Sequence, residues 1–181
     1  MKRPALWTAV ALAALWLEVG WIPHFPGLPR PHLPLLLACG LGLVYGPRQG
    51  AAAGAIAGLW VDLWIGRLVG SSAVLYAAAG WLAGKAGESL YRDMPGLSPA
   101  LGAAATLVTE LARGLLVSAA AGLPVTAADL LAWPQRLWPD LVAAAVAAPL
   151  VFRLVLGVER REREARGYDA AGGSGWRGGW P

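Results

Sequence analysis

Four ionisable side chains interrupt long apolar stretches of this 181-residue chain: Glu18, Asp62, Glu110 and Arg113. A charge at membrane depth is costly, so it usually pairs, faces a bundle interior or marks a functional site. Glu110 and Arg113 are three residues apart on one predicted helix face, and we expect them to form a neutralising ion pair. Asp62 has no such partner nearby. We expect its carboxylate either to accept hydrogen bonds from a helix N-terminus near residues 70–72 or to contact a partner protein.

The residue patterns of common enzymes are not found in the sequence. His24 and His32 fall in a proline-rich connector with no carboxylate or cysteine at metal-ligand spacing, which predicts surface-loop histidines rather than a metal site. Ser71 and Ser72 have no base at a recognisable spacing, and the glycines do not form a phosphate-binding loop. We therefore expect no catalytic residue, no metal and no cofactor. Cys39 lies in an apolar run and is predicted to be a buried small side chain.

The composition indicates an integral membrane protein. The chain is 57% hydrophobic and only 14% charged, whereas about a quarter of the residues of a soluble domain are charged. The net charge of +4 is spread over short loops and one tail, which favours membrane orientation over nucleic-acid binding. Several tryptophans fall near predicted membrane borders, where indole rings are favoured: Trp7, Trp21, Trp64, Trp133 and Trp138.

Apolar runs predict an all-α polytopic fold with six transmembrane helices over residues 1–158, followed by a charged helical extension and a flexible glycine-rich tail over residues 159–181. Pro134 is expected to end a short surface helix ahead of the last span, and Pro149 to kink that span. The second span is short enough to suggest a tilt. The six predicted spans are residues 5–22, 35–46, 49–65, 71–87, 99–121 and 140–158.

The basic residues predict the orientation. With six spans, eleven of the fifteen Lys and Arg residues lie on the side of the two termini, three lie on the other side and Arg113 lies within a span. Cytoplasmic loops carry the excess of Lys and Arg. Both termini are therefore expected in the cytoplasm, with the chain in the cell membrane.

A stripe of small residues runs along the third predicted span. Gly46, Gly50, Gly54 and Gly58 recur every four residues, and the spacing continues to Asp62 and Gly66. Positions four apart lie close together on a helix surface, and glycine lets a second helix approach closely in a membrane. We expect part of this stripe to pack inside the bundle. A second glycine pair, Gly80 and Gly84, follows in the fourth span.

Residues 31–84 resemble the rod shape-determining protein family MreD. The resemblance rests on the Gly-Pro-Arg turn, the glycine-rich helix ending in Asp62, a glycine-rich turn and a helix carrying tyrosine and glycine. This chain has His32 where the family often has an aspartate. The residues that carry the resemblance are Pro31, Gly46, Arg48, Gly50, Gly54, Gly58, Asp62, Gly70, Tyr76 and Gly80.

The resemblance implies a non-catalytic membrane scaffold of the bacterial cell-elongation (rod) complex, which supports peptidoglycan synthesis and cell shape. It implies MreC as a partner, with RodA, a penicillin-binding transpeptidase and MreB in the wider complex. It also implies a fold similar to the substrate-binding subunits of energy-coupling-factor transporters. On this reading, part of the glycine stripe packs inside the bundle, and MreC binds the outward ends of the first and third spans.

That similarity of fold leaves a second interpretation open. The chain could be a substrate-binding membrane subunit of an energy-coupling-factor type vitamin transporter. This function needs an outward-facing pocket lined by groups such as Glu18, Asp62, Trp64 and Tyr76. A copurifying vitamin or ATPase module would favour transport, and copurifying MreC would favour the scaffold.

Overall fold

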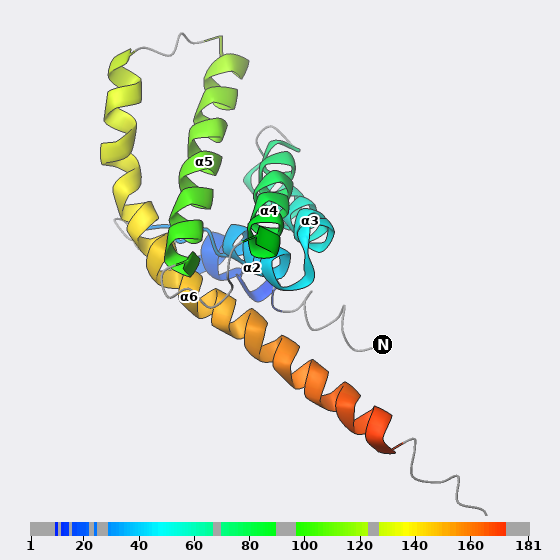
Figure 1. Cartoon of the computed structure of the whole chain (residues 1–181). Helices are drawn as coiled ribbons and strands as arrows, with labels where there is room; N and C mark the ends of the chain where they lie inside the picture. Colours follow the sequence, from blue (N-terminus) through cyan, green and yellow to red (C-terminus); the bar gives the residue numbers. More distant parts are fainter. Residues whose placement is uncertain are drawn as a thin grey trace, which may run out of the picture.

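A computed structural model describes residues 10, 12–14, 16–21, 24, 29–66, 70–89, 97–122 and 127–172. Within these residues the regular structure is entirely helical (Figure 1). The predicted all-α class is confirmed, and the bounds of α2 to α5 agree with the predicted spans to within about two residues. The elements are η1 (Leu17–Trp21), α2 (Leu33–Tyr45), α3 (Pro47–Ile65), α4 (Ser71–Ser89), α5 (Leu97–Ala120) and α6 (Ala127–Gly172).

Helix α2 is the centre of the fold. It contacts α3 and α4, and it also contacts α5 and α6. Every residue from position 34 to position 40 is buried, with Leu35, Leu36 and Cys39 at 0% exposure. A helix that is apolar all round must be covered on all sides, which explains why the shortest predicted span lies inside the bundle. The predicted burial of Cys39 is confirmed.

Helices α3 and α4 pack backbone to backbone through the predicted glycine stripe. A Cβ added at Gly50 would collide with the carbonyl of Gly80, and one at Gly54 with the carbonyl of Tyr76. At Gly58 the obstacle would be the carbonyl of Ser72. The expectation that part of the stripe packs inside the bundle is therefore confirmed.

The two ends of the stripe have a different role. Gly46 and Gly66 have φ angles of 100° and 67°, a region that L side chains rarely adopt. Gly46 forms the break between α2 and α3, and Gly66 ends α3. Gly84 of the second glycine pair packs against the backbone of Pro47, so this pair also lies at a helix contact.

Helix α6 corrects the prediction for the C-terminal part. The expected surface helix, the sixth span and the charged extension form one continuous helix of 46 residues. Pro134 does not end it, and the helix continues to Gly172. Figure 1 shows α6 changing direction where yellow passes into gold. Three prolines lie in this helix, and each lacks the amide donor of a regular turn, which commonly bends a helix.

Among the residues that the structure describes, two helical segments are long and apolar enough to cross a membrane: Pro99–Ala120 and Leu137–Arg161. Helix α2 is apolar but shorter. The described helices also present large apolar side chains outward, including Leu63 at 62%, Val74 at 69% and Leu150 at 66% exposure. Apolar exposure on this scale indicates contact with lipid or with other proteins.

Several predicted features lie outside the described residues. These are the start of the first span with Trp7, most of the proline connector, the turn at residues 67–69, the loop at residues 90–96 and the tail after residue 172.

Candidate functional site

Asp62 joins the end of α3 to the start of α4. Its carboxylate is 3% exposed, and its Oδ2 accepts hydrogen bonds from the backbone N–H of Gly70 at 2.8 Å and of Ser72 at 2.9 Å. These amides belong to the first turn of α4, which has no intrahelical acceptors for them. A carboxylate there also faces the positive end of the helix dipole. Of the two roles expected for Asp62, the structure bears out the helix N-terminal contact.

Arg113 reaches from α5 to α4. Its Nη1 lies 3.5 Å from Oε1 of Glu110, so the predicted ion pair is confirmed. Its Nη2 donates to the Ser72 hydroxyl at 3.1 Å and to the Tyr76 hydroxyl at 3.4 Å. Because Ser72 also donates its backbone N–H to Asp62, one chain of contacts joins α3, α4 and α5.

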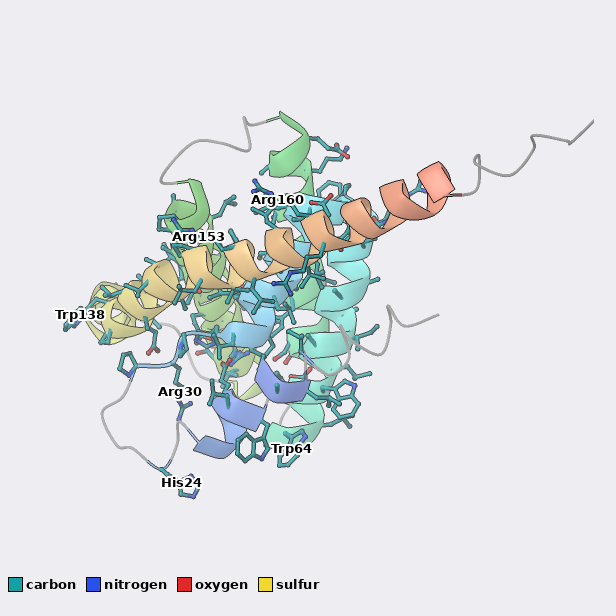
Figure 2. The ribbon with its side chains drawn as sticks, turned by 90° about the horizontal axis from the view of Figure 1, so that it is seen from below. His24, Arg30, Trp64, Trp138, Arg153 and Arg160 are labelled. Atoms are coloured by element: carbon teal, nitrogen blue, oxygen red, sulfur yellow. The ribbon has the colours of Figure 1, made fainter. Side chains whose placement is uncertain are left out.

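His32 corrects a prediction. It is not in an exposed loop: its residue exposure is 6%, and it lies between two carboxylates. Its Nδ1 is 3.5 Å from Oε1 of Glu18, and its Nε2 is 3.6 Å from Oε1 of Glu110. His24, by contrast, is exposed, and Figure 2 shows it pointing away from the helices.

The backbone of His32 is itself unusual. Its φ of 48° and ψ of 51° lie in the left-handed region, and among the described residues it is the one residue other than glycine with a positive φ. Such a conformation costs energy and persists where the surroundings enforce it. Here His32 is the N-cap residue of α2, and its carbonyl accepts the first helical hydrogen bond from Leu36 at 3.0 Å. The imidazole is thus held inside the bundle by its place at the start of α2.

Glu18 connects the N-terminal segment, meaning the described residues between positions 10 and 21, to the same cluster. It lies in the single π-helical turn η1, with its side chain 11% exposed. A π turn changes the direction in which side chains project and occurs often at functional sites. We call these residues the polar network: Glu18, His32, Asp62, Ser72, Tyr76, Glu110 and Arg113.

The network couples α3, α4 and α5. Asp62 and Tyr76 are engaged with backbone amides and with Arg113. Some buried atoms still lack a hydrogen-bond partner, namely Oε2 of Glu18, Nε2 of His32, Oγ1 of Thr106 and Oε1 of Glu110. No group of three or more potential metal ligands is placed to hold an ion within the described part of the chain.

Two hollows of the described surface are lined by apolar or aromatic side chains outside the polar network. One groove of about 240 Å³ separates the N-terminal segment from α2 and α6 and is lined by apolar side chains such as Ala13, Leu37 and Val151. A second hollow of about 310 Å³ is lined by Trp60, Leu63 and Trp64 on α3. Trp64 is 61% exposed, so it does not share a pocket with the buried Asp62 and Tyr76. Trp138 is likewise 61% exposed, and both tryptophans lie at the periphery in Figure 2.

Sequence reasoning missed His32, Ser72 and Thr106 as members of the buried interior. The side-chain contacts of His32 and Ser72 join elements far apart in the sequence, so neither helical spacing nor hydropathy indicates them. The left-handed backbone of His32 is visible only in the folded chain. Comparison of the chain with known protein families, with curated proteins and with solved structures found no match.

Proposed function

We propose that this chain is a non-catalytic membrane scaffold of the MreD type in the bacterial rod complex. The proposal rests on the resemblance of residues 31–84 and on one structural observation that supports it. The polar side chains of that region are engaged in helix–helix contacts, as in Asp62 with the N-terminus of α4 and Arg113 with Ser72. Groups used in this way hold a bundle together and leave recognition to its outer surfaces.

The proposed arrangement has six membrane crossings, with both termini in the cytoplasm. The distribution of Lys and Arg supports it, as do the two apolar helical segments and the outward-facing apolar side chains. With this orientation, the turn held by Asp62 and the start of α2 lie on the outer side of the membrane.

The proposed partner is MreC, with RodA, a penicillin-binding transpeptidase and MreB in the larger assembly. Because α4 occupies the glycine stripe of α3, a partner helix would use the opposite face of α3. That face carries Leu59, Trp60, Leu63 and Trp64 at 42%, 42%, 62% and 61% exposure. Large aromatic side chains on an open face are typical of interface centres.

Single-cysteine cross-linking to co-expressed MreC tests this arrangement. Each variant carries Cys39→Ala and one new cysteine. Cysteines at Leu63 and Trp64 are expected to cross-link. Matched cysteines at Val74 on α4 and Leu150 on α6, which are exposed at 69% and 66%, are expected to cross-link less. Cross-linking at Val74 or Leu150 with none on α3 would reject the proposed face, and failure of MreC to copurify at all would reject the function.

The transport alternative receives less support. It needs Glu18, Asp62, Trp64 and Tyr76 around one outward pocket, but Trp64 faces outward while Asp62 and Tyr76 are buried. A vitamin found bound to the purified protein would reverse this preference.

A further inference from the structure

Both ring nitrogens of His32 face carboxylates that come from different elements. Nδ1 lies 3.5 Å from Glu18 and Nε2 lies 3.6 Å from Glu110. A neutral imidazole carries one N–H, so its other nitrogen presents a lone pair. That lone pair would face a carboxylate oxygen, which also offers only lone pairs. The contact is favourable only when a proton lies on the second ring nitrogen or on the carboxylate that faces it.

The net charge of the buried groups around His32 also favours an added proton. The charged groups next to the ring are Glu18 from η1 and Glu110 with Arg113 from α5. With both carboxylates ionised and His32 neutral, the buried group has a net charge of −1. One added proton makes it neutral. An uncompensated buried charge is strongly unfavourable, so the folded cluster favours the proton-bound form.

The other ionisable groups around the cluster do not supply this compensation. Tyr76 of α4 contacts Arg113 through its neutral hydroxyl. Asp62 of α3 is held by two backbone amides. Asp140 of α6 accepts a hydrogen bond from the backbone N–H of Arg30 at 2.7 Å. The side chains of Arg30 and Asp140 carry opposite charges and act on His32 in opposite directions, so together they leave the charge count unchanged. The missing positive charge is therefore a proton.

The position of this proton matters because Glu18 joins the N-terminal segment to His32 at the start of α2. A groove of about 240 Å³ lies between that segment and α2 and α6. Leu12, Trp16 and Leu17 are 42%, 61% and 43% exposed. Arg113 already forms an ion pair with Glu110, so the added proton is assigned to the Glu18–His32 contact.

We infer that Glu18 and His32 share one exchangeable proton, and that this proton latches the N-terminal segment onto the start of α2. With two protons on the pair, His32 is cationic and Glu18 is a neutral acid, so the buried cluster carries an uncompensated positive charge. With none, a lone pair of the ring faces a carboxylate and the cluster carries a negative charge. Docking of the N-terminal segment is strongest when the pair holds one proton.

Nuclear magnetic resonance of the full chain in lipid nanodiscs tests the proton count. The chain has two histidines, and the exposed His24 serves as an internal reference for the buried His32. Labelled histidine and glutamate report both protonation states, and Glu18→Gln assigns the Glu18 signal. At neutral pH we expect either a cationic His32 with an ionised Glu18, or a neutral His32 with Glu18 as the acid. A neutral His32 beside an ionised Glu18 would overturn the inference, as would a protonated Glu110.

Spin-label distances test the latch. Labels at Leu12→Cys and Leu150→Cys, with Cys39→Ala, join the N-terminal segment to α6. We expect one narrow distance distribution near neutral pH that broadens at acid and at alkaline pH. Glu18→Gln should abolish this pH response, and the control Glu88→Gln, at an exposed carboxylate, should keep it. A distribution that does not change with pH, or an unchanged response in Glu18→Gln, would overturn the latch.

Discussion

At the scale of single residues, Asp62 and Arg113 each satisfy groups on a neighbouring element. Asp62 accepts two amides of α4, and Arg113 contacts Glu110, Ser72 and Tyr76. In a low-dielectric interior a polar group left without its partner is costly, so the loss of one side chain penalises the groups that remain. We therefore predict the effect on stability of replacing each of the two residues separately.

Replacing Asp62 with alanine leaves the first amides of α4 without an acceptor. We expect the free energy of unfolding to fall by about 2 kcal/mol, seen as a lower midpoint in a thermal unfolding assay in detergent. Asp62→Asn keeps an acceptor oxygen and should lose less. Glu88→Gln, at a carboxylate with 52% side-chain exposure, is the control and should leave the midpoint unchanged.

Arg113→Met removes the cation that neutralises Glu110. The expected loss is about 2 kcal/mol, less than for a fully buried pair, because the Arg113 side chain is 25% exposed. Adding Glu110→Gln removes the uncompensated carboxylate and should recover part of the stability. A double-mutant cycle of unfolding midpoints measures the coupling. Strictly additive losses would show that the two side chains do not interact.

At the scale of elements, the backbone contact of α3 with α4 depends on glycine. Gly54→Ala places a methyl group against the Tyr76 carbonyl. Backbone cannot move aside as a flexible side chain can, so we expect a loss of about 3 kcal/mol, at the upper end for overpacking. The midpoint of thermal unfolding gives the measurement.

Gly157 in α6 is the matched control. A Cβ there would meet nothing within 4 Å. Because alanine is a better helix former by about 0.5–1 kcal/mol, Gly157→Ala should leave the midpoint unchanged or raise it. Equal destabilisation by the two substitutions would mean that close packing of α3 on α4 is not the cause.

At the scale of the whole molecule, the charge distribution predicts where each segment lies. A cytoplasm-active reporter fused after Pro181 should be active. Single cysteines in place of Arg48 and Arg30, in the Cys39→Ala background, should react with a membrane-impermeant thiol reagent in intact cells only at position 30. Labelling at position 48, or an externally active C-terminal reporter, would contradict six crossings.

Local features of the sequence determined much of this protein. Apolar runs and proline or glycine boundaries predicted α2 to α5, because burial and backbone limits act within one segment. Spacing predicted the Glu110–Arg113 pair, and contact with the start of α4 was one of the two roles expected for Asp62. Each of these interactions joins residues within one helix or across one turn.

The tertiary structure alone decided the position of His32 and the continuity of α6. The imidazole is buried because η1 and α5 bring carboxylates to the start of α2 from distant parts of the chain. Helix α6 passes through its prolines because neighbouring packing can compensate for missing amide hydrogen bonds. Both outcomes depend on which elements contact one another in the folded chain, and the sequence pattern of a single segment does not specify those contacts.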